Sequence, residues 1–282
     1  MKKRILIPTD FSATALNAVR YAMELYKDVP CEFYLLNAFQ ISGYSVDNPI
    51  EPEPGDIAFK AGKDESEQGL SDLLEKLSFH PENPNHDLYT IATYNSLLHA
   101  VKMVIAEKDI DLVVMGTKGI TGAESLIFGT NAINIMEGIT SCPVLAIPEA
   151  YGFDAPREIV FPTDFKTHYK RRELNYLLDI ASLHKAAIRV LHIKGSKDLK
   201  PDQENNKELL KTILGATEHS FDTLLGRSVH RSIGAFVKNR GCNMIAIINR
   251  KHTLLDNLLS RPLVKEMGYH YKIPILALND YR

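Results

Sequence analysis

The sequence is poor in cysteine, lacks tryptophan and has no long apolar run. Its three cysteines, Cys31, Cys142 and Cys242, are odd in number and widely spaced, so they form neither a CxxC pair nor a disulfide framework. We expect them to be reduced and buried. No apolar stretch approaches the roughly 18 residues of a membrane span, and the first twelve residues, MKKRILIPTDFS, lack a signal-peptide core. These absences predict a cytoplasmic protein with no membrane partner.

An excess of one charge is also missing. Lysine and arginine total 33 against 35 for aspartate and glutamate, which gives a formal net charge of −2. Proteins that bind polyanions through a general electrostatic field carry a clear basic excess. The balance therefore predicts that the chain does not bind nucleic acid.

Several motifs of catalysis are absent as well. The ten histidines include no HExxH pattern, and neither Gly-x-Ser-x-Gly nor a supported Cys-His pairing occurs. The nearest match to a Walker sequence, Gly62-Lys63-Asp64, lacks the first glycine and the hydroxyl residue. We therefore predict no metal site and no covalent nucleophile.

What the sequence does contain is an internal repeat. Residues 5–11 read ILIPTDF and residues 159–165 read IVFPTDF, while CPVLAIP at 142–148 matches IPILALN at 273–279. A chain of 282 residues is also long enough for two domains of common size. We predict one domain over 1–148, a linker over 149–156 and a second domain over 157–282.

Within each copy, short apolar runs alternate with stretches of helical periodicity, which is typical of parallel strands joined by helices. Ser12 is a candidate N-cap for the first helix, and another helix follows Ser96. We predict two tandem α/β domains, each a doubly wound five-stranded parallel sheet. The predicted strands are 3–8, 32–39, 87–93, 110–115 and 143–147, then 157–161, 187–193, 220–225, 243–248 and 274–278.

The copies differ most at residues 41–62, a stretch rich in proline and acidic residues that the second copy lacks. One interpretation is a solvated surface loop, since loops tolerate insertions. The other is a lid over a ligand at the strand ends, since loops of this length are often functional.

A glycine-rich loop follows the predicted strand that ends at Met115. Gly116-Thr117-Lys118-Gly119 is followed, nine residues later, by Gly129-Thr130 at the start of a helix. A strand, a glycine turn and a helix N-terminus together present N–H groups and a positive dipole end to an anion. Glycines can adopt backbone angles closed to other residues, and Thr130 is placed to cap the helix or contact a phosphate. The loop is compatible with phosphate binding, although glycines in turns alone would give the same pattern.

These motifs together resemble the universal stress protein family in its tandem, two-domain form. ILIPTDFS, the Gly-x2-Gly-x9-Gly-Ser/Thr pattern in GTKGITGAESLIFGT, and CPVLAIP occur in the order that the family shows. The resemblance implies an adenine-nucleotide alpha-hydrolase-like fold that binds ATP, with Mg²⁺. It implies nucleoside contacts from Pro8, Thr9, Asp10 and Ala38, and phosphate contacts from Met115, Gly116, Lys118, Gly119, Gly129, Thr130 and Asn131.

Asp10 has a second interpretation. An aspartate just after a strand commonly caps the following turn, and Asp164 repeats it in the second copy, where the glycine loop is not repeated. This repetition favours a partly structural role for Asp10.

The second copy has no such loop. Its corresponding stretch starts at Asn249 and contains Ser260, opposite Gly129, and Pro262, which has no amide donor. We predict that this second site is lost. The basic residues near it, and the cluster Lys166, His168, Lys170, Arg171 and Arg172 that opens a helix, could hold another anion or form a solvated face.

With this resemblance we predict a stress-response protein whose first domain binds ATP as a regulatory ligand. The alternatives are slow ATP hydrolysis on the same loop, whose only carboxylate is Glu124, and a nucleotide-independent interaction scaffold. We also predict that residues 144–147 and 275–278 pair within the chain about a pseudo-two-fold axis, because unpaired apolar strand edges associate. The sequence does not decide whether whole chains also form a homodimer.

Overall fold

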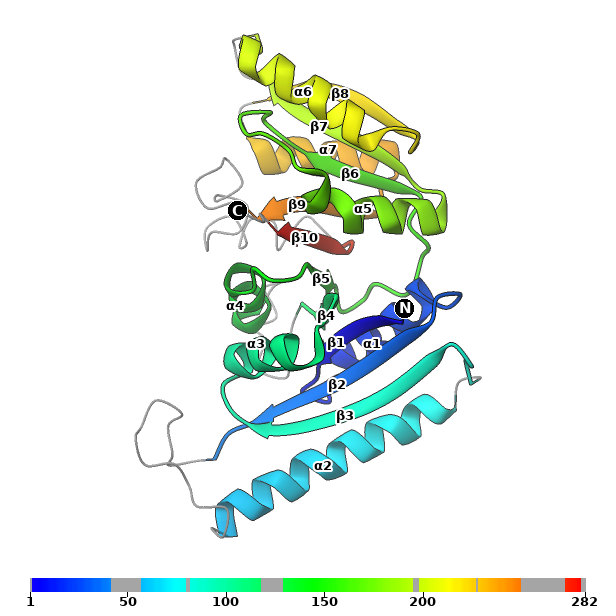
Figure 1. Ribbon diagram of the computed structural model, residues 1–282, viewed down its shortest axis with the longest axis vertical. Helices are drawn as coiled ribbons and strands as arrows, with labels where there is room; N and C mark the ends of the chain where they lie inside the picture. Colours follow the sequence, from blue (N-terminus) through cyan, green and yellow to red (C-terminus); the bar gives the residue numbers. More distant parts are fainter. Residues whose placement is uncertain are drawn as a thin grey trace. The chain divides into compact units, whose positions relative to one another are not determined.

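The computed structural model describes residues 2–41, 57–79, 82–117, 129–194, 198–226, 228–249 and 272–279. By its internal contacts the chain divides into two compact units, the first ending at Phe153 and the second beginning at Asp154. In each unit the described strands form a parallel sheet that helices cover (Figure 1).

The first unit contains five strands among its described residues, in the sheet order β3-β2-β1-β4-β5. Each strand runs parallel to its neighbours. Because the order reverses beside β1, helices cover both faces of the sheet. The elements are β1 (Lys3–Pro8), α1 (Ala13–Leu25), β2 (Cys31–Phe39), α2 (Ile57–Ser78), β3 (His86–Tyr94), α3 (Leu97–Lys108), β4 (Leu112–Gly116), α4 (Thr130–Gly138) and β5 (Val144–Ile147).

The second unit repeats this topology in the order β8-β7-β6-β9-β10, again with parallel neighbours. The predicted fold class and the predicted strands of both copies are confirmed. The pairing of residues 144–147 with 275–278 stays a prediction. The elements are β6 (Glu158–Pro162), α5 (Arg171–His184), β7 (Ala187–Lys194), α6 (Pro201–Leu214), β8 (His219–Leu225), α7 (Val229–Arg240), β9 (Met244–Asn249) and β10 (Ile275–Asn279).

The core of each unit is its central strands. Parallel strands covered on both faces are apolar at successive positions, and β1 follows this rule with Ile5, Leu6 and Ile7, all fully buried. The first helix starts where the sequence predicts, since the Ser12 hydroxyl accepts the Ala15 N–H at 3.1 Å.

Part of the segment 41–62, which we predicted to be a loop, is helical. Residues 42–56 lie outside the described part of the chain, so the lid interpretation is not addressed there, but α2 already begins at Ile57. Residues 57–62 contain two alanines and a lysine, which favour a helix, and they extend the helix whose buried face includes Leu70 and Leu73.

All three cysteines are free and buried, as expected. Burial raises the pKa of the Cys31 and Cys142 thiols to about 12 and that of Cys242 to about 11. The helices of the described residues include none that is both long and apolar enough to cross a membrane.

Candidate functional site

The turn after β1 is held in place by a dense set of hydrogen bonds. Thr9 is 6% exposed; its N–H donates to the Leu36 carbonyl at 2.8 Å, and its own carbonyl accepts from Asn37 Nδ2 at 2.8 Å. Its hydroxyl accepts the N–H of Phe11 at 3.0 Å, and Phe11 has a left-handed backbone with φ of 64°. This turn is therefore fixed against the neighbouring strand β2.

Asp10 takes the structural role that its position suggests. Its Oδ1 accepts the Ser12 N–H at 3.1 Å, just before α1. In the second unit Asp164 accepts the Lys166 N–H at 3.0 Å, and Phe165 repeats the positive φ at 55°. The repeated Pro-Thr-Asp-Phe sequence thus encodes a repeated turn, which also places each aspartate at the carboxyl edge of its sheet.

Ala38 lies beyond the end of β1. Successive residues of a strand direct their main-chain groups to opposite neighbours, and the Leu36 carbonyl faces the β1 side. Ala38, two residues further, therefore faces the same side, but β1 ends at Pro8, which is paired with Leu36. The main chain of Ala38 is consequently directed toward the space after the turn that carries Thr9.

Gly116, the last residue of β4, is required for a reason other than the predicted one. Its φ does not lie in the left-handed region, so the expected freedom of backbone angle is not used. Instead, a Cβ at this position would lie 2.6 Å from Cγ2 of Thr14 and 3.0 Å from the Thr14 carbonyl oxygen. The glycine allows the first turn of α1 to approach the end of β4 closely.

The two ends of the glycine-rich segment meet at Thr117. Its N–H donates to the Ile147 carbonyl at 3.0 Å, and its carbonyl accepts the Gly129 N–H at 2.6 Å. The side chain is 1% exposed, and its hydroxyl has no hydrogen-bond partner among the described residues. A buried hydroxyl without a partner is costly, which makes it a candidate contact for a ligand.

The helix α4 begins directly after this junction. Gly129 is the N-cap, with φ of −70° and ψ of 162°, so Thr130 is the first helical residue, and of its two predicted roles the helix cap is not used. Glycine tolerates the extended N-cap backbone and leaves the first N–H groups of the helix without a side-chain cap. Thr130 and Asn131 are exposed, and the first turn contains no acidic residue. This end of α4 is suited to an anion.

The structure therefore brings the ends of β1 and β4, which are adjacent strands, together with the N-terminus of α4 through Thr117. Pro8 and Met115 are buried at these strand ends. Lys118 and Gly119 lie outside the described residues, as does Glu124, so their predicted roles rest on the sequence. Three residues that the sequence did not single out also belong to this edge: Asn37, Ser66 and Thr117.

The carboxyl edge of the second unit carries a different residue at the position equivalent to Gly116. When the two units are aligned by strand register, Ile248 is equivalent to Gly116 and Asn249 is equivalent to Thr117. This differs by one residue from the sequence prediction, which matched Asn249 to Gly116. Ile248 is 3% exposed. A branched, buried side chain thus occupies the position where the first unit has glycine. Ser260, Arg261 and Pro262 lie outside the described part of the chain, and the loss of the second site stays a prediction.

The basic cluster of the second unit does not open a helix as a whole. The helix α5 starts at Arg171 with Lys170 as N-cap, so Lys166 and His168 precede it. The Lys170 N–H donates to the buried Glu173 carboxylate at 3.0 Å, and Lys166 pairs with Asp164 at 3.5 Å. An acidic residue already occupies this helix start, which disfavours a second anion there.

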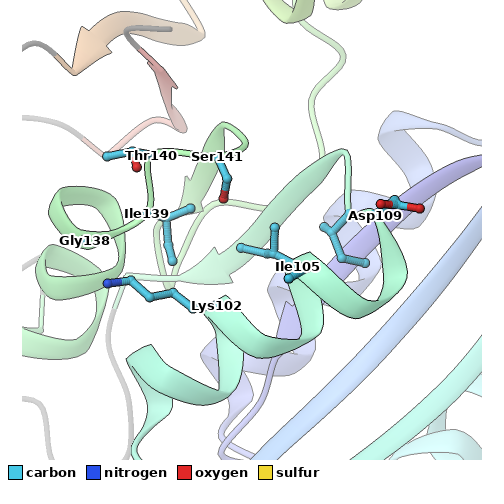
Figure 2. A pocket seen from close by; sticks show the side chains of 9 residues that line it. Lys102, Ile105, Asp109, Gly138, Ile139, Thr140 and Ser141 are labelled. Atoms are coloured by element: carbon cyan, nitrogen blue, oxygen red, sulfur yellow. The ribbon is translucent and has the colours of Figure 1, made fainter. Parts of the chain in front are cut away.

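A separate hollow of about 510 Å³ lies where α3 and α4 end (Figure 2). These helix ends lead into the starts of β4 and β5, so the hollow is at the amino edge of the sheet, opposite the candidate site. None of the predicted site residues that the structure describes lines it. The same part of the chain contains no group of three or more possible metal ligands. Its lining includes Lys102, Ile105, Asp109, Ile139, Thr140 and Ser141.

Comparisons with known proteins agree with the architecture. Residues 1–148 match the model of the Universal stress protein family. A universal stress protein of Methanocaldococcus jannaschii is 28% identical over 145 residues, which are 51% of this chain and 81% of that protein. Among solved structures, a universal stress protein from Archaeoglobus fulgidus aligns over 98% of both chains, with a TM-score of 0.70 and 13% identity. A protein from Pseudomonas aeruginosa aligns over 99% of this chain and 93% of its own, with a TM-score of 0.60 and 13% identity. At these identities the two structures establish the fold alone.

Proposed function

Because the chain belongs to the universal stress protein family, we propose that its first unit binds ATP as a regulatory ligand at the carboxyl edge of its sheet. The observation that carries this proposal is the junction at Thr117. There the Gly129 N–H bonds to the end of β4 and brings an acid-free helix N-terminus beside two adjacent strand ends. In open parallel sheets, ligands bind beyond the carboxyl ends of the strands, and phosphates favour helix N-termini.

The phosphate end of the ligand would lie on α4. The N–H groups of its first turn, the unpartnered Thr117 hydroxyl and the Thr130 hydroxyl are the donors that the described residues offer. Lys118 and Gly119 would complete this end, as the family resemblance implies. A magnesium ion would be held by the phosphate oxygens, since carboxylate ligands are scarce at this edge.

The nucleoside end would lie against the turn after β1. The main chain of Ala38 would face the base, and Pro8, Thr9 and Asp10 would surround the nucleoside, while Met115 at the end of β4 would lie with the phosphate contacts. This assignment agrees with the direction of the Ala38 main chain and with the rigid hydrogen bonding of Thr9.

Regulation is favoured over hydrolysis by the state of Asp10. Its Oδ1 accepts the Ser12 N–H ahead of α1, a structural bond that Asp164 repeats in the second unit. The glycine-rich segment itself offers a single carboxylate, Glu124, as a base or water-positioning group. ATP would instead act by binding one conformation of the loops around the site more tightly than another.

The proposal is tested by calorimetric titration of the full chain with ATP and magnesium, together with phosphate-release assays. We expect one nucleotide per chain and no steady phosphate release. Gly119→Val would place a branched side chain beside the phosphates; losing two charged hydrogen bonds costs about 3 kcal/mol, or roughly a hundredfold in affinity.

The matched control is Arg261→Ala in the second copy, which should leave the affinity nearly unchanged. Two equivalent sites per chain, or an unaltered affinity in Gly119→Val, would contradict the assignment of the glycine loop. No binding by the unmodified chain would contradict the proposal as a whole and leave the scaffold alternative.

A further inference from the structure

A buried hydrogen-bond chain connects helix α2 to the turn after β1. Ser66 Oγ donates to Asn37 Oδ1 at 2.7 Å, and Asn37 Nδ2 donates to the Thr9 carbonyl at 2.8 Å. Ser66 is 3% exposed and Asn37 is 9% exposed. The amide orientation is fixed by its partners, because the Thr9 carbonyl can only accept. We refer to these three residues as the Ser66–Asn37–Thr9 relay.

The second unit makes the same contact to its turn with a different side chain. The strand registers and the bonds of Thr9 and Thr163 place His192 at the position of Asn37. The His192 Nδ1 lies 3.0 Å from the Thr163 carbonyl, so this nitrogen carries the proton that it donates. The helix connection differs, since Asn206 of α6 donates directly to the Phe165 carbonyl at 2.8 Å. The donor to the turn is thus retained while the helix attaches elsewhere.

We propose that Asn37 and Ser66 are positioning residues that determine how well the first unit recognises the base of its nucleotide. This inference rests on the proposed function, because it concerns the nucleoside end of the same site. Asn37 precedes Ala38 in β2, so one residue links the strand that faces the base to the turn that carries Thr9 and Asp10. The relay sets the distance between these two parts.

The phosphate end should be independent of the relay. It is built on β4 and α4, which are joined through Thr117 and Gly129 and make no hydrogen bond to Asn37 or Ser66 in the described residues. Loss of the relay should therefore weaken binding of the nucleoside and not that of the phosphates. This separation distinguishes a positioning role from a general loss of structure.

The experiment compares the affinities of ATP and of inorganic tripolyphosphate, each with magnesium, in the full-length chain. Asn37→Ala leaves the buried Thr9 carbonyl without its donor, and we expect about tenfold weaker ATP binding with unchanged tripolyphosphate binding. Asn37→His should restore ATP binding, because the second unit holds its turn with a histidine. Ser66→Ala removes one bond further from the turn and should weaken ATP binding by about threefold.

His192→Ala is the matched control, since it removes the equivalent bond from the second unit and should leave both affinities unchanged. Circular dichroism and thermal unfolding establish that each variant is folded; should Asn37→Ala fail to fold, Asn37→His and Ser66→Ala decide the matter by the same ratio. Equal weakening of ATP and tripolyphosphate, or ATP binding by Asn37→Ala as tight as in the unmodified chain, would overturn the inference. Absence of ATP binding in the unmodified chain would instead overturn the proposed function, and this inference with it.

Discussion

The carboxyl edges of the two sheets differ in how closely a helix approaches them. In the first unit α1 begins three residues after Asp10, and Thr14 lies so near β4 that position 116 has no room for a side chain. In the second unit α5 begins seven residues after Asp164, and the position equivalent to Gly116 holds the buried Ile248. The helix that begins soon after its aspartate, α1, is thus accompanied by a glycine at the end of β4. The helix that begins later, α5, is accompanied by an isoleucine at the equivalent position of β9.

The two carboxyl edges therefore differ in the start of the helix that packs beside them and in the residue that ends the strand, as well as in their loops. A phosphate site at the end of β4 needs a main chain that is accessible and held rigidly. The close packing of Thr14 on Gly116 supplies rigidity without filling the edge. In the second unit the buried Ile248 occupies the equivalent position, and the loss of the nucleotide site there stays a prediction.

The largest expected effect comes from giving the first edge the residue of the second. In Gly116→Ile the new Cβ would meet Thr14 at 2.6 Å and force α1 away from β4. We expect a loss of about 2 to 3 kcal/mol in the free energy of unfolding, together with loss of ATP binding. Urea denaturation and calorimetric titration measure the two effects.

Gly152→Ala provides the control, because no atom lies within 4 Å of a Cβ at that position. It should change the free energy of unfolding by less than about 0.5 kcal/mol. A Gly116→Ile protein as stable as the Gly152→Ala protein would show that the packing on Thr14 does not constrain the edge.

A second comparison concerns the buried thiols, of which the first unit has two and the second has one. Burial raises the pKa of each, so the folded protein keeps them protonated at a pH where the unfolded chain ionises. The folded state then binds more protons, and stability must fall as the pH rises above about 9. We expect the free energy of unfolding to fall more steeply with pH in the double variant Cys31→Ser, Cys242→Ala, which retains Cys142, than in a variant that lacks all three thiols.

Thiol titration with a chromogenic disulfide provides the independent measurement. At pH 8 the folded chain should react slowly at all three cysteines, and the chain in urea should react at all three. Rapid reaction of one thiol in the folded chain would contradict the burial of that cysteine.

The smallest expected effect is at two equivalent helix ends. The helix before β4 ends at Asp109 with φ of 47°, and the helix before β9 ends at Gly241 with φ of 67°. Exchanging them, Gly241→Asp should lower the free energy of unfolding by about 1 kcal/mol, and Asp109→Gly should raise it by about 0.5 kcal/mol. The Asp109 contact with Arg4 is exposed and offsets little of this gain. Urea denaturation of both variants checks the signs, and two changes of the same sign would contradict this account.

Much of the fold could be predicted from local pattern. The strands, the N-cap at Ser12 and the repeated turn all depend on residues close together in sequence, and the structure has them where they were predicted. The start of α2 at Ile57 was missed because the proline-rich, acidic stretch before it obscures the change to helical periodicity.

The candidate site depends more on distant residues. The need for glycine at 116 comes from Thr14, and the role of Asn37 comes from Ser66 and Thr9, none of which is adjacent in sequence. The correspondence of Ile248 with Gly116 follows from strand register, which similarity between two short loops cannot establish. Contacts of this kind become visible once the strands are paired.

The hydrogen bond from Gly129 to Thr117 has a consequence for the evolution and engineering of this family member. It joins the two ends of the intervening segment, so the length of that segment can change without moving β4 or α4. The free energy of closing a loop grows slowly, by about 0.6 kcal/mol for each doubling of its length. Changing the number of residues between positions 117 and 129 should therefore cost little in the free energy of unfolding.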